Sequence, residues 1–290
     1  MKSKFFVPVL LALLGLAIFA PDAVAESRTN NIYWTPVVAT EGGEKIDQIL
    51  NVIFILTATV FVLVNVFFIY YLIRYRRKPG VKAQYVHGNM GAEIIWTAIP
   101  SLIFLTLAIW GNHVWNELVK TPAPEDAVVV EVVGYQFAWD FRYAGADGEV
   151  DETALEKISQ DNKFGLILED PNLTDDFATT EMVIPVGKPV HILLRSRDVI
   201  HSFYVPEFRI YQDAVPGRSI DWIWFVTTRE GEFTLACSQL CGAGHFNMKA
   251  PIKVVSQEEF DQWYAARVKA RGEEIATYAL EKQKTDVAAK

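Results

Sequence analysis

The chain has 290 residues, of which 51% are hydrophobic and 21% are charged, with a mean hydropathy of +0.16 and a formal net charge of −8. It is too apolar for a purely soluble protein of this size and too polar for one that lies entirely in lipid. The acidity argues against a nucleic-acid partner and suggests that any charged protein partner is basic.

The first segment has the pattern of a secretory signal. Lys2 and Lys4 precede an apolar run over residues 5–20, and Ala23-Val-Ala25 supplies the small residues of a cleavage site. We therefore predict a signal peptide over residues 1–25. An uncleaved membrane helix is the alternative, but the run is short for one. Residues 26–45 are polar and are predicted to form an external N-terminal segment.

Two later stretches are predicted to cross the membrane as a hairpin over residues 46–115. The spans cover about residues 49–73 and 93–115, each long enough for a bilayer. Residues 74–92 between them carry a basic cluster that marks a cytoplasmic loop: Arg74, Arg76, Arg77, Lys78 and Lys82. Both mature termini and the rest of the chain then lie on the periplasmic side of a bacterial plasma membrane.

Residues 116–255 are predicted to form an outer all-β domain. Short alternating runs rich in Val, Ile, Phe and Trp are separated by Pro and Gly, as in a Greek-key sandwich or barrel. The candidate strands cover residues 127–133, 138–143, 181–185, 190–196, 201–205, 219–226 and 231–236. An acidic run over 144–178 is predicted to be a solvated loop, without an assigned role. Ser256 and Glu259 form a capping box that opens a helical, exposed tail over 256–290.

A stretch near the end of the outer domain, residues 237–248, has the composition of a metal site. It holds the only two cysteines of the chain, Cys237 and Cys241, together with His245 and Met248. Thiolate, imidazole and thioether favour copper, whereas a structural zinc would leave Met248 without a role. A disulfide between the two cysteines is the other alternative outside the cytoplasm.

The number of thiolates indicates more than one metal ion. A mononuclear blue-copper site uses one Cys, two His and a weak Met, whereas two thiolates can bridge two metals. A second histidine is then expected on a strand that faces the loop, and His201 is well placed for this. An isolated histidine in an apolar strand is otherwise more often a core residue with its hydrogen bonds satisfied.

At these residues the chain resembles subunit II of cytochrome c oxidase, a haem-copper terminal oxidase. The motifs are His201-Ser-Phe, Asp213-Ala-Val-Pro-Gly-Arg218 and Cys-x3-Cys-x3-His-x2-Met, and the resemblance covers nearly the whole chain. It implies a two-helix transmembrane hairpin with a cupredoxin-like Greek-key barrel and a binuclear copper centre, CuA. The implied ligands are His201, Cys237, Cys241, His245, Met248 and the backbone carbonyl of Gln239.

The resemblance also implies roles for residues outside the ligand set. Phe137 stands where the family has an exposed Trp at which cytochrome c docks and delivers its electron, with Trp139 two positions on. Asp198 matches an acidic docking patch, and Glu93 matches a glutamate at the mouth of a proton pathway. Gln239 replaces a Glu that helps to hold a magnesium ion, and since a neutral amide is a poorer ligand, we do not expect this ion here.

The implied function is that of an electron-accepting subunit, with the chemistry of oxygen reduction and the proton pump in other chains. The implied partners are catalytic subunit I with haem and CuB, subunit III, and cytochrome c or another c-type haem donor. No Cys-x-x-Cys-His motif occurs in the sequence, so the donor is expected to be a separate molecule or subunit. Three alternatives are a quinol oxidase subunit, a nitrous oxide reductase fragment and a membrane-tethered copper carrier or assembly factor.

Overall fold

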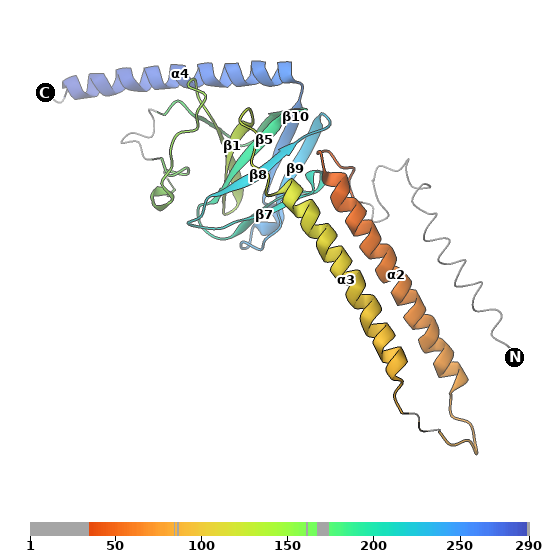
Figure 1. Ribbon diagram of the computed structural model, residues 1–290. Coiled ribbons are helices and arrows are strands. Elements are labelled where there is room, and N and C mark those ends of the chain that lie inside the picture. The colour runs from red at the N-terminus through yellow and green to blue at the C-terminus, as the bar shows by residue number, and fades with distance from the viewer. Residues whose placement is uncertain (1–34, 84, 86, 161, 167–173, 289–290) are drawn as a thin grey trace. The chain divides into compact units, whose positions relative to one another are not determined.

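The computed structural model describes residues 35–288 except 84, 86, 161 and 167–173, so the predicted signal peptide lies outside it. Within the described chain there are two compact units. One contains two long helices, and the other contains all the strands and the C-terminal helix (Figure 1).

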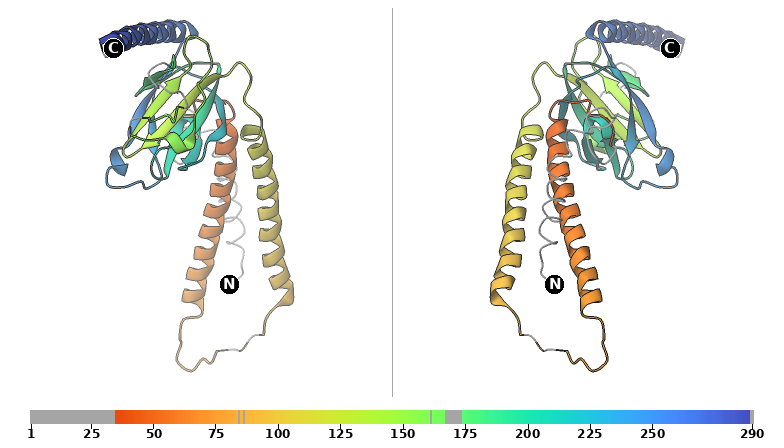
Figure 2. Two further views of the ribbon diagram at one scale, coloured as in Figure 1. Left: turned by 90° about the vertical axis from the view of Figure 1, so that its left-hand side faces the viewer. Right: turned by 90° about the vertical axis from the view of Figure 1, so that its right-hand side faces the viewer.

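The helical unit is a hairpin of α2 (Gly43–Arg74) and α3 (Met90–Leu118) (Figure 2). Both helices are long and apolar enough to cross a membrane, and the mean hydropathy of an 18-residue stretch is 2.8 in α2 and 1.9 in α3. Two polar side chains in α2 bond to the backbone of their own helix, since Thr57 Oγ1 donates to the Ile53 carbonyl at 2.8 Å and Asn65 Nδ2 to the Phe61 carbonyl at 2.8 Å. Such residues can therefore lie inside an apolar span without a partner helix.

The second unit is a β-sandwich followed by helix α4, which agrees with the predicted all-β class. Its two five-stranded sheets have the orders β3-β2-β1-β5-β8 and β4-β10-β9-β6-β7. The pairs β1/β5 and β4/β10 are parallel, so the chain crosses between the sheets instead of forming simple hairpins. The strands are β1 (Val128–Tyr135), β2 (Ala138–Tyr143), β3 (Phe177–Thr179), β4 (Met182–Pro185), β5 (Pro189–Ser196), β6 (His201–Val205), β7 (Ile210–Ala214), β8 (Ile220–Val226), β9 (Gly231–Cys237) and β10 (Lys249–Val255).

The core lies between the two sheets and contains large side chains from both. Trp139 and Phe203 are fully buried, and their rings meet edge to face with centroids 6.4 Å apart. Tyr143 joins the sheets through its hydroxyl, which donates to the Val183 carbonyl at 2.9 Å and accepts from the Val183 amide at 2.9 Å. This packing fixes one sheet against the other and so fixes the positions of the strand ends.

Residues 38–43, at the end of the predicted external segment, belong to the β-unit and pack on it. Ala39 is fully buried, and its amide donates to the Glu207 carbonyl at 2.8 Å. Thr40 forms an antiparallel bridge with Thr227. The chain therefore pairs with the sandwich immediately before the first helix begins.

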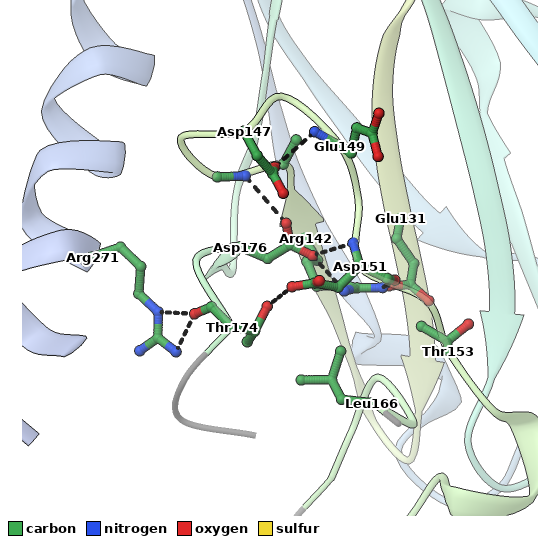
Figure 3. Close-up of polar contacts among 12 residues, drawn as sticks. Glu131, Arg142, Asp147, Glu149, Asp151, Thr153, Leu166, Thr174, Asp176 and Arg271 are labelled. Atoms are coloured by element: carbon green, nitrogen blue, oxygen red, sulfur yellow. Dashed lines mark hydrogen bonds and ion pairs between the residues drawn. The ribbon is translucent and has the colours of Figure 1, made fainter. Parts of the chain in front are cut away.

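The acidic segment that we expected to be solvated is also partly folded onto the sandwich (Figure 3). Arg142 on β2 is buried and forms ion pairs with Glu131 on β1 and with Asp176, at 2.5 Å between Arg142 Nη1 and Asp176 Oδ2. Arg142 Nη2 also donates to the Asp151 carbonyl at 3.0 Å, and Arg195 forms a further ion pair with Glu131. The segment thus covers the outer face of the first sheet and is fixed there by buried charges.

Helix α4 (Gln257–Ala288) begins at the predicted cap, since Ser256 Oγ accepts from the Glu259 amide at 3.2 Å. Its first half is not an exposed tail, because Phe260 is buried and Tyr264 donates to the Ala144 carbonyl at 2.9 Å. The guanidinium of Arg271 donates from Nε to the Thr174 carbonyl at 3.1 Å. The helix therefore closes one edge of the sandwich and holds the end of the acidic segment.

We predict that Arg142→Met destabilises the β-unit by about 3–5 kcal/mol at pH 7.5, because it leaves the buried Asp176 carboxylate without its counter-charge and leaves Glu131 with Arg195 alone. Burial raises the pKa of Glu131 and raises that of Asp176 to about 6, while Arg142 opposes both shifts. A carboxyl with a raised folded-state pKa favours the folded state at low pH, and this benefit is lost as pH rises through that pKa. The defect should therefore be smaller at pH 5.

Urea unfolding of the full chain in detergent, followed by tryptophan fluorescence at both pH values, measures this difference. Arg267→Met is the control, since Arg267 is exposed on α4; it should change the free energy of unfolding by roughly 0.5 kcal/mol or less. Equal, small effects of the two substitutions would show that the buried ion pairs do not hold the segment.

Candidate metal centre

The ends of the 237–248 stretch are brought together by strand pairing. Cys237 ends β9 and Met248 immediately precedes β10, and the Cys237 amide donates to the Met248 carbonyl at 3.0 Å. His201 opens β6, which pairs with β9 so that Phe203 lies opposite Cys237. The predicted strand that faces the loop is therefore present, and it places the second histidine at the same end of the sheet.

The donor atoms of the predicted ligands form one connected cluster. The two Sγ atoms lie 3.8 Å apart; Cys237 Sγ is 3.9 Å from His201 Nδ1 and 3.2 Å from the Gln239 carbonyl oxygen. Cys241 Sγ is 3.6 Å from the Nδ1 of His245 and 3.8 Å from the Sδ of Met248. Each sulfur thus faces its own imidazole and one weaker donor, and this set of thiolate, imidazole and thioether groups is one that copper favours.

The arrangement discriminates among the three candidate uses of the cysteines. Both cysteines are free, with their sulfurs well beyond the roughly 2.05 Å of a disulfide bond. Met248 is buried with its sulfur directed at Cys241, so the thioether is part of the cluster, which a zinc site would not need. The residues present fit a copper pair better than either alternative.

The site is largely shielded from water. His201 and Met248 are 0% and 1% exposed, and only His245, in the short helix His245–Asn247, is half-buried. Burial, together with the neighbouring Cys237, raises the pKa of the Cys241 thiol to about 11. Metals bind cysteine as the thiolate, so metal binding at this site would release protons.

The imidazole of His201 is oriented from behind by a carboxylate. Its Nε2 lies 2.8 Å from Asp198 Oδ1, which assigns the ring proton to Nε2 and leaves the Nδ1 lone pair directed toward Cys237. Burial opposes ionisation of Asp198, but hydrogen bonds from the Gln136 amide, His201 and the Val199 amide outweigh it and lower the pKa of the carboxyl. Asp198 therefore remains a carboxylate and holds the tautomer that a metal ligand needs.

The residues predicted to meet an electron donor do not share one environment. Phe137 is 38% exposed and its ring lies against the loop, because a Cβ on Gly244 would come within 2.5 Å of it. Trp139 is 1% exposed, with its ring edge to face on His201, so it cannot contact a docking protein directly. Asp198 is exposed, but its carboxylate oxygens are directed inward to the bonds just described.

Glu93 belongs to the helical unit and lies in the first turn of α3. Asn89 caps that turn, with its Oδ1 accepting from the Ala92 amide at 3.1 Å. The Glu93 side chain is half-buried and reaches back beside Gly88. This placement suits a stabilising N-terminal carboxylate as well as the mouth of a pathway.

Sequence reasoning missed one residue that contacts the loop. Gln136 Nε2 donates to the carbonyl of Cys241 at 2.6 Å, across a separation of 105 positions. A glutamine in a turn between two strands gives no signal of such a contact. Only its place in an aromatic run beside Phe137 could have drawn attention to it.

Comparison with known proteins agrees with this architecture. Residues 128–256 match the family described as cytochrome C oxidase subunit II, periplasmic domain, and residues 29–114 match the transmembrane domain of the same subunit. The alternative cytochrome c oxidase subunit 2 of Bradyrhizobium diazoefficiens is 37% identical over 80% of this chain and 82% of its own. Cytochrome c oxidase subunit 2 of Cereibacter sphaeroides is 33% identical over 79% of this chain and 76% of its own.

Among solved structures, the periplasmic domain of subunit II of the oxidase of Bradyrhizobium japonicum is 29% identical. The match covers 51% of this chain and 98% of the chain in the solved structure, with a TM-score of 0.38. The two family matches together span most of the chain, and the curated relatives match most of their own length. The chain therefore belongs to the cytochrome c oxidase subunit II family, whose members are subunits of the haem-copper oxidase complex.

Proposed function

We propose that this chain is the subunit through which electrons enter its oxidase, and that it holds two copper ions in a CuA centre. The observation that carries the proposal is the connected cluster of six donor atoms, in which two thiolates each face an imidazole and a weaker donor. The ligands would be Cys237, Cys241, His201, His245 and Met248, with the Gln239 carbonyl as the sixth donor. Soft sulfur donors in this number select copper over hard cations.

A dinuclear copper centre bridged by both thiolates would supply a one-electron carrier whose charge is shared by two metals. The surrounding chain would keep the reorganisation energy of that electron transfer low. His201, Cys237 and Met248 lie at the ends of paired strands beside a packed aromatic core, so they move little, and the burial of four of the five ligand side chains limits the response of water. Asp198 fixes the orientation of His201 from outside the ligand set.

The same features argue against a copper carrier or assembly factor. A carrier must release its metal readily and therefore needs accessible ligands, whereas four of the five ligand side chains are buried. A quinol oxidase subunit would lack the ligands altogether. We further propose that the centre receives electrons from a c-type haem protein at the Phe137 side and passes them to haem in catalytic subunit I. The β-unit would lie on the periplasmic side of the bacterial plasma membrane, and subunit III would complete the complex.

The full chain, purified in detergent and supplied with copper, should bind two copper ions. Its electron paramagnetic resonance spectrum should show hyperfine splitting from one electron shared by two equivalent nuclei. Cys241→Ser removes one bridge and should abolish that pattern, whereas Ser238→Ala, an exposed position between two ligands, should preserve it. A single-copper spectrum, stoichiometric zinc, or a metal-free Cys237–Cys241 disulfide in the native protein would overturn the assignment.

Phe137 offers a test of the electron donor's docking place. Phe137→Ala should slow electron transfer from a reduced c-type cytochrome to the intact oxidase by about tenfold or more, as for an aromatic contact at the centre of an interface. The copper content should not change. Leu280→Ala is the control, since Leu280 is an exposed apolar residue on α4. Unaltered KM and rate constant for the donor in the Phe137 variant would exclude docking over this ring.

Glu93 can be tested in the same complex. If its carboxyl passes protons to the catalytic subunit, Glu93→Gln should lower oxygen consumption and proton uptake together, because the amide cannot exchange a proton. Glu44→Gln, an exposed carboxylate in the first turn of α2, is the matched control. Full turnover with normal proton uptake in the Glu93 variant would leave this residue with only its role at the helix N-terminus.

A further inference from the structure

The turn between β1 and β2 makes two hydrogen bonds to residues of the metal cluster or next to it. Gln136 Nε2 donates to the Cys241 carbonyl at 2.6 Å, and the main-chain N–H of Gln136 donates to Asp198 Oδ2 at 2.8 Å. The other oxygen of Asp198 binds the His201 ring at 2.8 Å. One residue is therefore linked to Cys241 directly and to His201 through a single carboxylate.

The turn also lies in contact with the backbone of the ligand loop. A Cβ on Gly242 would be 2.9 Å from Gln136 Nε2 and 3.0 Å from the Phe137 ring, and a Cβ on Gly244 would be 2.5 Å from that ring. Gly242 has a φ of +136°, which only glycine adopts without strain. The loop thus has no side chains where the turn rests on it, which lets the amide of Gln136 approach the Cys241 carbonyl.

These contacts bridge two parts of the ligand set that strand pairing alone does not join. Pairing of β9 with β10 fixes Cys237 and Met248 at the two ends of the loop. Cys241 lies in the middle of the loop, on residues that belong to no strand, so its position needs other support. Its carbonyl bond to Gln136 supplies that support from the opposite sheet.

We propose that Gln136 is a positioning residue for the metal centre. By holding the Cys241 carbonyl and the Asp198 carboxylate at once, it sets the position of one bridging thiolate relative to the imidazole of His201. This inference rests on the proposed function, since it concerns copper bound by this cluster. Groups that orient metal ligands from outside typically change metal affinity by about 10- to 100-fold when they are removed.

The test compares Gln136→Ala and Gln136→Glu with the wild-type full chain, each loaded with copper in detergent. Alanine removes the donor, and glutamate keeps the size of the side chain but presents an oxygen to the Cys241 carbonyl, so its effect should be at least as large. Both variants should lose copper to a chelator about 10- to 100-fold faster than the wild type. Their electron paramagnetic resonance hyperfine couplings and reduction potentials should also change.

Gln160→Ala is the matched control, because Gln160 is an exposed glutamine elsewhere in the β-unit; it should behave as the wild type. Thermal unfolding of the metal-free proteins separates positioning from folding, and the Gln136 variants should melt with the wild type. Unchanged copper release and spectra, or faster release that merely follows a lowered melting temperature, would overturn the inference. If the wild-type chain itself gave no two-copper spectrum, the proposed function would fail first.

Discussion

The metal centre depends on the register of three neighbouring strands. Lys249 pairs with Ala236 in the β9–β10 ladder, so the next residue along each chain segment, Cys237 at the end of β9 and Met248 just before β10, must lie side by side. The pairing of β6 with β9 then places His201 at the same sheet end. A shift of one residue in either ladder would turn these side chains to the opposite face and separate the thiolate from the imidazole. The 237–248 loop can be short and contain glycines because the pairing of β9 with β10 holds its two ends together.

Much of the fold and the ligand set follows from patterns that are local in the sequence. Alternation predicted the strand that His201 opens, and the soft donors clustered in 237–248 predicted copper before any geometry was known. Strands β3, β7 and β10 were not among the predicted strands; in β10, Pro251 lies opposite Thr234 and the strand continues through it, although proline is uncommon inside a sheet. The acidic segment was misjudged for a different reason: its charges find partners on strands far away in the chain, as Asp176 does with Arg142.

The same long-range effect explains why docking residues were harder to predict than ligands. In a sandwich with one solvated face, alternate residues of β2 would be exposed, yet five of its six residues are buried, because described parts of the acidic segment, among them Asp151 and Asp176, pack on the outer face. Trp139 and Asp140 are therefore both inside, and an exposed tryptophan at the copper end cannot be inferred from alternation. Metal ligands can be predicted without knowledge of such coverage, since their chemistry depends on the type of donor atom. The exposure of a side chain depends on what covers its strand.

The covering segment also reaches the turn that contacts the copper loop. Tyr135, beside Gln136, has the Arg197 guanidinium 4.1 Å from its ring centroid and the Lys163 ammonium at 5.1 Å, and its hydroxyl donates to Asp140 at 3.1 Å. Lys163 belongs to the covering segment and forms an ion pair with Asp140 at 2.6 Å. These contacts restrain Tyr135, while the next residue, Gln136, contacts the Cys241 carbonyl. The acidic segment, which contributes none of the proposed ligands, thus supports the turn that contacts Cys241.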